Sequence, residues 1–216
     1  RHGYVQQSLS TPDGQTLMMG HIGTLAANPA LYRNLSFDIG AFVPVALVAN
    51  VANFLVVTNR LQATDVRSLV ALAKRDPGRL TYGSGGNGSA AHIAMVAFLE
   101  ATGTDMTHVP YNGIAPTLQA MIAGDVQVGI DDVASAQASI RAGRVRALVV
   151  SGRARLPQLP DVPTFIEAGY PSVDLPLWNA LFAPAGTPDA ILVRVRAAFV
   201  KVLEEPEVVA KLLDAG

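Results

Sequence analysis

The sequence has no cysteine among its 216 residues and few charged residues. The absence of cysteine excludes disulfide bonds, thiol catalysis and thiolate metal sites. Asp, Glu, Lys and Arg together make up 15% of the chain, and the formal net charge is -1. A chain without a basic excess lacks the electrostatic surface that binds nucleic acids. Since half of the residues are apolar, we expect a compact, soluble protein with no nucleic-acid partner.

Membrane-length apolar runs and the common enzyme motifs are also missing. No apolar stretch approaches the ~20 residues that a transmembrane helix needs. The histidines are scattered and match neither HxxxH nor HExxH, so we expect no metal site. We also expect no cofactor. Ser84, Ser89 and Ser151 lie outside any Gly-x-Ser-x-Gly hydrolase motif. We therefore expect a protein without catalytic residues.

The two ends of the chain also lack expected features. The chain begins at Arg1-His-Gly-Tyr4 without an initiator methionine or a basic and apolar leader, and it stops at Ala215-Gly216 directly after an amphipathic helix. We expect a fragment or a processed form, in which missing parts carry some of the site.

Glycine, by contrast, is concentrated in the stretch 80–92, where an apolar strand is predicted to turn directly into a helix. Gly83, Gly85, Gly86 and Gly88 fall within six residues of one another. Glycine allows positive φ and lets a ligand approach the backbone without interference from Cβ. The stretch therefore predicts a loop that contacts a ligand.

The helix predicted after this loop, at about residues 89–102, can be capped by Ser89 or Ser84. The first N–H groups of a helix have no partners inside it, and together with the helix dipole they form a site for a phosphate or a carboxylate. His92, one turn into the helix, can reach back to brace the loop. A tight strand-to-helix turn with a good cap and no ligand remains the alternative.

Strands and helices alternate regularly from residue 80 onwards. The predicted strands are 80–83, 106–109, 126–130 and 146–151, and the predicted helices are 89–102, 115–123 and 133–142. This alternation predicts βαβ units with a mainly parallel sheet covered on both faces. Ligands of such sheets bind beyond the carboxyl ends of the strands. Those ends are the loops Ser84–Ser89, Tyr111–Ala115 and Asp131–Asp132.

The residues before this block predict two further features. Thr16–Gly20 is short and apolar, as a buried strand would be, and leads into a loop, Gly20–Thr24, that offers a second ligand-binding edge. Further along, Thr64 is expected to cap a helix that begins at Asp65.

The domain organisation follows from two apolar runs, 43–57 and 177–183, which we interpret as crossings between lobes. The first lobe then comprises 1–50 with 180–216, and the second lobe, 51–179, is inserted into it. A two-lobed protein of this kind places its ligand in the cleft.

Two enzyme hypotheses concern the same loops. Gly83–Gly88 fits the GxGxxG pattern of dinucleotide sites. Such a site also needs an acidic residue at the end of the next strand, but that strand ends Val109-Pro-Tyr-Asn112. We therefore keep an enzyme that binds a nucleotide or a phosphorylated substrate through Gly83–Gly88 only as the alternative hypothesis.

Asp131 and Asp132 suggest an acid and a base. Adjacent strand residues point to opposite sides, however, so we expect one of them to hydrogen-bond ligand or loop amides.

An ordered set of motifs along nearly the whole chain resembles a known family. The motifs are Asn28–Tyr32, Pro44–Ala49, Tyr82–His92, His108–Pro116, Ile140–Leu148, Leu159–Thr164 and Leu181–Pro188. They are similar to those of the tripartite tricarboxylate transporter substrate-binding family, the Bug-type extracytoplasmic solute receptors. The resemblance implies an α/β fold of the periplasmic binding protein type II kind, with two Rossmann-like lobes around a cleft and a truncated first lobe.

The resemblance also implies function and site. Members capture small carboxylates, such as dicarboxylates, tricarboxylates, acidic amino acids or aromatic acids, in the periplasm for the membrane subunits of a transporter, and they are not enzymes. Carried over by position, the family's ligand contacts correspond to Ser84, Gly85, Asn87, Gly88, Ser89, Asp131, Gly23 and Thr24. Truncation of the first lobe would expose strand edges, which makes a homodimer plausible.

Overall fold

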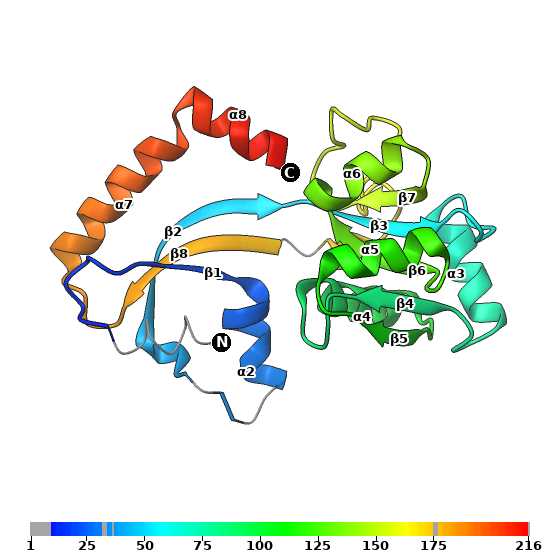
Figure 1. Cartoon of the computed structure of the whole chain (residues 1–216), viewed down its shortest axis with the longest axis horizontal. Helices are drawn as coiled ribbons and strands as arrows, with labels where there is room; N and C mark the ends of the chain where they lie inside the picture. Colours follow the sequence, from blue (N-terminus) through cyan, green and yellow to red (C-terminus); the bar gives the residue numbers. More distant parts are fainter. Residues whose placement is uncertain (1–9, 32–33, 36, 175–176, 216) are drawn as a thin grey trace. The chain divides into compact units, whose positions relative to one another are not determined.

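The computed structural model describes residues 10–31, 34–35, 37–174 and 177–215 (Figure 1). Its contacts divide the chain into two compact units. Unit 1 comprises Arg1–Val51 and Leu177–Ala215, and unit 2 comprises Ala52–Pro176. The chain therefore enters unit 2 once and leaves it once.

Unit 2 alternates strands and helices along most of its length. Its elements are β3 (Asn53–Thr58), α3 (Val66–Arg75), β4 (Thr81–Ser84), α4 (Ala90–Thr102), β5 (Thr107–Pro110), α5 (Ile114–Ala123), β6 (Val128–Asp132), α6 (Val133–Arg141), β7 (Val145–Val150) and the short 3-10 helix η3 (Pro171–Val173). The seven elements predicted from residue 80 onwards are all present. An α/β fold is confirmed.

The five strands of unit 2 form one sheet in the order β5-β4-β6-β3-β7. β4 pairs in parallel with β5 and β6, whereas β3 pairs antiparallel with β6 and β7. The prediction of a mainly parallel sheet thus omitted one antiparallel strand near its centre, because an apolar run carries no signal of direction. In the register, Ser84 lies opposite Pro110 and Gly83 opposite Gly129, so β4, β5 and β6 end at the same edge.

Helices cover both faces of this sheet, as predicted (Figure 1). On one face, Leu55 of β3 belongs to a core with Leu69 of α3 and Phe98 of α4, all fully buried. On the other, Phe54 of β3 packs in a core with Met121 of α5. Alternate residues of β3 thus serve opposite layers, because side chains of a strand alternate between faces.

A reciprocal pair of hydrogen bonds between Asp65 and Ser68 marks the start of α3. The Asp65 carboxylate accepts a hydrogen bond from Ser68 N at 2.7 Å, and Ser68 Oγ accepts one from Asp65 N at 3.1 Å. This reciprocal pair is a capping box. The prediction that Thr64 caps the helix was wrong by one residue, because the box can close only around Asp65.

Unit 1 consists of a small sheet with short helices and a helical C-terminal part. Its elements are β1 (Met18–His21), the π-helix η1 (Gly23–Ala27), α2 (Asn28–Leu31), the 3-10 helix η2 (Ile39–Ala41), β2 (Phe42–Val51), β8 (Leu177–Pro184), α7 (Asp189–Leu203) and α8 (Pro206–Ala215). The sheet is antiparallel in the order β1-β8-β2. Every residue of α7 is exposed or half-buried. No described helix is long and apolar enough to cross a membrane.

Candidate functional site

The glycine loop connects β4 to α4 at the carboxyl edge of the unit 2 sheet, and we define it as Ser84–Ser89. Ser89 is the N-cap of α4, since its Oγ accepts a hydrogen bond from His92 N at 3.2 Å. This confirms the predicted serine cap. Gly86 has φ +116°, a conformation that side chains of L-residues rarely adopt. The loop shape therefore depends on glycine.

Gly85 lies close to the loop between β5 and α5, which leaves little room for a side chain. A Cβ on Gly85 would lie 3.3 Å from the carbonyl carbon of Gly113 and 3.5 Å from Ile114 N, at the start of α5. Tyr111 N donates to Ser84 O at 2.9 Å and joins the same two loops. The glycine loop therefore packs directly against the start of α5.

Ser84 holds the glycine loop from the inside. Its side chain is fully buried, and its Oγ accepts a hydrogen bond from Gly86 N at 3.2 Å and lies 2.6 Å from His108 Nε2. Ser84 Oγ also lies 3.1 Å from Gly86 O. The hydroxyl already has three partners within the chain, which determines the path of the loop.

Backbone donors remain at this edge. Among the described residues, the N–H groups of Gly85, Ala90 and Ala91 donate no hydrogen bond within the chain. Gly85 and Ala90 are half-buried, so their donors can still reach a ligand. These amides and the positive end of the α4 dipole, on a helix of 13 residues, favour an anion.

Asp131 and Asp132 were expected to point to opposite sides, but both carboxylates contact Ser135 of α6. Asp132 caps α6, since its Oδ1 accepts from Ser135 N at 2.8 Å. Asp131 is 3% exposed and accepts a hydrogen bond from Ser135 Oγ through Oδ1, while its Oδ2 has no partner among the described residues. Burial, with a smaller contribution from the charge of Asp132, raises the pKa of Asp131 to about 6. The two carboxylates thus hold the start of α6 rather than form an acid–base pair.

Gly23 and Thr24 lie in unit 1. The predicted loop Gly20–Thr24 was wrong, because β1 continues to His21 and η1 begins at Gly23. Thr24 is 7% exposed, and its Oγ1 lies 2.8 Å from His21 Nε2. Burial lowers the pKa of His21. A ligand contact for Gly23 and Thr24 stays a prediction.

An aromatic stack beside the glycine loop was only partly anticipated. Gly88 N donates to His92 Nδ1 at 3.1 Å, so His92 braces the loop as the sequence suggested. The ring of His92 stacks on His108 at a centroid distance of 4.2 Å, and His108 stacks on Tyr82 at 4.8 Å. Sequence reasoning missed the roles of Tyr82 and His108, since only the register that sets Tyr82 opposite His108 brings them together.

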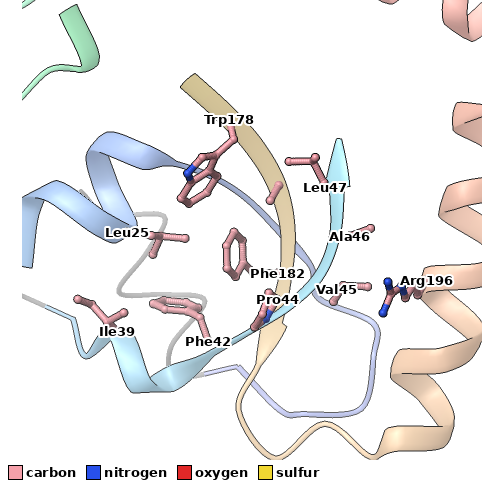
Figure 2. A pocket seen from close by; sticks show the side chains of 11 residues that line it. Leu25, Ile39, Phe42, Pro44, Val45, Ala46, Leu47, Trp178, Phe182 and Arg196 are labelled. Atoms are coloured by element: carbon pink, nitrogen blue, oxygen red, sulfur yellow. The ribbon is translucent and has the colours of Figure 1, made fainter. Parts of the chain in front are cut away.

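The described residues also form a pocket, but no metal site. No group of three His, Asp or Glu residues in the described part of the chain could hold a metal ion. A pocket of about 630 Å³ lies in unit 1 and is lined mainly by apolar side chains of β2 and β8, including Phe42, Trp178 and Phe182, with Arg196 of α7 (Figure 2). None of the predicted ligand-binding residues lines this pocket.

Comparison with known sequences places the chain in a family. Residues 2–216 match the model of the tripartite tricarboxylate transporter family receptor. A UPF0065 protein of Bordetella pertussis is 35% identical over 207 residues, which cover 96% of this chain and 64% of that protein. The chain thus spans about 64% of the length of this curated relative.

Solved structures agree with the family. A Rhodopseudomonas palustris protein with adipate is 33% identical with a TM-score of 0.88, covering 100% of this chain and 72% of that one. MatC of the same organism, with bound malate, is 32% identical with a TM-score of 0.84, covering 98% and 72%. The periplasmic binding protein BugD is 26% identical with a TM-score of 0.84, covering 99% and 72%.

These neighbours are periplasmic solute-binding proteins rather than enzymes, as the resemblance implied. The family match covers almost the whole chain and agrees with the α/β fold and with the glycine loop at the carboxyl edge of the sheet. The chain belongs to the tripartite tricarboxylate transporter receptor family, the group that includes the Bug proteins.

Proposed function

We propose that this chain captures a small carboxylate through the glycine loop Ser84–Ser89. The observation that carries the proposal is the set of unpaired N–H groups at Gly85 and Ala90, at the start of α4 and beside the start of α5. Ser84 holds the loop at Gly86, and Ala90 belongs to a helix of 13 residues, so these donors lose little conformational freedom on binding. A carboxylate oxygen accepts hydrogen bonds of this charge-assisted kind.

The chemistry at the loop favours a carboxylate over a nucleotide. The glycine loop and the first turns of α4 and α5 contain no lysine or arginine, whereas a polyphosphate carries several charges to be neutralised. β5 ends at Pro110 and is followed by Tyr111 and Asn112, without an acidic residue for a ribose. Neighbours of this chain carry adipate and malate, which supports the same class of ligand.

The remaining assignments follow from the family and the positions of the residues. Asn87 is exposed at the tip of the loop and can donate its amide to the ligand. Asp131 lies at the end of β6 with a free carboxylate oxygen and orients the ligand or a water molecule. Gly23 and Thr24 would contact the ligand from unit 1. The loaded receptor would pass its ligand, in the periplasm, to the membrane subunits of a tripartite tricarboxylate-type transporter.

Charge at the helix cap offers a matched pair of variants. Aspartate and asparagine cap helices about as well as serine, so Ser89→Asp and Ser89→Asn should both keep α4. We expect Ser89→Asp to weaken carboxylate binding roughly tenfold or more, because its negative charge repels the ligand. Ser89→Asn should retain most of the affinity. Calorimetric titration of both variants measures the difference, and equal losses would show that charge at this cap is irrelevant.

The proposal itself is tested by thermal unfolding with a panel of ligands. The panel contains adipate, malate, citrate, glutamate and benzoate, together with ATP and NAD. A ligand at a hundred times its dissociation constant adds about 2.7 kcal/mol to the free energy of unfolding. We expect a rise in Tm with at least one carboxylate and none with the nucleotides. Stabilisation by a nucleotide alone, or by no carboxylate in the panel, would overturn the proposal.

A further inference from the structure

The aromatic stack of Tyr82, His92 and His108 lies directly against the glycine loop at two points. His108 Nε2 is 2.6 Å from Ser84 Oγ at the start of the loop, and His92 Nδ1 is 3.1 Å from Gly88 N near its end. The two imidazole rings are nearly parallel, with an interplanar angle of 18°. One pair of histidines therefore holds both ends of the loop.

The two contacts respond differently to a proton. His92 Nδ1 accepts the Gly88 N–H bond, so this nitrogen must be unprotonated. A proton on His92 Nδ1 would place two N–H groups face to face and break the contact. Ser84 Oγ can both donate and accept, so its contact with His108 Nε2 survives when that nitrogen carries a proton. His92 is thus the proton-sensitive brace.

The surroundings of His92 oppose its cationic form. The ring is half-buried on the first turn of α4, at the positive end of the helix dipole. The titratable groups that face it are His108 of β5 and Tyr82 of β4. No described carboxylate forms an ion pair with either imidazole. Burial lowers the pKa of His92, and burial together with the nearby His92 lowers the pKa of His108.

We propose that His92 is a positioning residue of the carboxylate site, whose neutral ring holds Gly88 and the glycine loop in the binding shape and whose protonation releases ligand in acid. The inference rests on the proposed function, since it concerns regulation of the same loop. The contact between Gly88 N–H and His92 Nδ1 lies within the chain, so it can be measured separately from ligand binding.

Three variants separate the effect from general damage. His92→Asn places a carbonyl oxygen near the position of Nδ1, so it keeps an acceptor for Gly88 N and does not titrate. His92→Leu removes the acceptor at every pH. His108→Gln keeps a polar partner for Ser84 and leaves His92 as the titrating group.

The test combines calorimetry with NMR from about pH 7.5 down to about pH 4, because burial lowers the pKa of His92 below the ordinary value of histidine. Adipate and malate are the probes, and each affinity is compared with that of His92→Asn at the same pH, because a carboxylate also gains protons near pH 5. Relative to His92→Asn, we expect the native chain and His108→Gln to lose roughly tenfold in affinity in acid. His92→Leu should bind weakly at both pH values. Equal pH profiles for the native chain and His92→Asn would overturn the proposal.

The NMR measurement distinguishes this failure from failure of the proposed function. In the ligand-free native chain, the Gly88 amide proton should move with the titration of the His92 ring, and this movement should vanish in His92→Asn. If neither probe binds at any pH, the proposed function is wrong. The Gly88 amide signal still shows in that case whether His92 Nδ1 accepts the Gly88 N–H hydrogen bond. A Gly88 amide chemical shift that does not change when His92 is protonated would contradict the inference, whether or not a ligand binds.

Discussion

Gly86→Ala is expected to weaken carboxylate binding roughly 100-fold, equivalent to the loss of one or two charge-assisted hydrogen bonds. Gly86 has φ +116°, where an L-residue is strained, and an added Cβ would lie 3.4 Å from Tyr111 O. The loop must therefore change its path. The N–H groups of Gly85 and Ala90 would then change their positions relative to each other, and calorimetric titration with adipate and malate measures the loss.

Gly103→Ala is the matched control for this variant. Gly103 is the C-cap of α4, at the opposite end of the same helix, and has φ +58° with no atom within 4 Å of an added Cβ. Its left-handed conformation is open to other residues at a cost of about 1 kcal/mol. Gly103→Ala should lower stability slightly and leave affinity unchanged. If both alanine variants bind equally well, the glycine loop does not hold the ligand.

Asp131→Asn is expected to raise the free energy of unfolding by roughly 3 kcal/mol at neutral pH and hardly at all near pH 4. The Asp131 side chain is 3% exposed, and its pKa is raised from 3.8 to about 6, mainly by burial. Above about 6 the folded chain carries a buried carboxylate that the unfolded chain keeps in water. Asparagine has a similar shape and can still accept the Ser135 hydrogen bond, but it carries no charge.

The sign follows from proton linkage. Between pH 3.8 and about 6 the folded state retains a proton on Asp131 that the unfolded state has lost, so stability falls as pH rises through this window. The advantage of Asp131→Asn must grow over the same window. Denaturant unfolding of both proteins at several pH values measures it, and the acidic point serves as the internal control. A difference that stays constant with pH would show that Asp131 is not a buried charge.

Local signals allowed much of unit 2 to be predicted. Strand, glycine loop and helix follow one another between Thr81 and Thr102, and Ser89 caps the helix as expected. These features depend on residues close in sequence, because glycine favours tight loops and serine favours the N-cap of a helix. The same kind of signal misled at two places. Gly20 and Gly23 suggested a loop where β1 passes into η1. Thr64 and Asp65 are both suitable N-cap residues, and the capping box with Ser68 forms at Asp65.

Long-range pairing accounts for the features that could not be predicted. The direction of β3 depends on its neighbours β6 and β7, which follow many residues later in the chain. The stack of Tyr82, His92 and His108 requires both the β4–β5 register and the position of the first turn of α4. No local pattern contains this information. The predicted ligand residues of unit 2 nevertheless lie at one sheet edge, because parallel strands end on the same side.

Backbone amide NMR of this chain, with and without saturating adipate or malate, tests the central claim most directly. The account predicts that the largest shifts on adding a carboxylate occur at the amides of Gly85 and Ala90 and at their neighbours in the glycine loop. The shifts should disappear in Gly86→Ala and persist in Gly103→Ala. A carboxylate that binds with its largest shifts elsewhere, leaving these amides unchanged, would contradict the claim that the start of α4 holds the ligand.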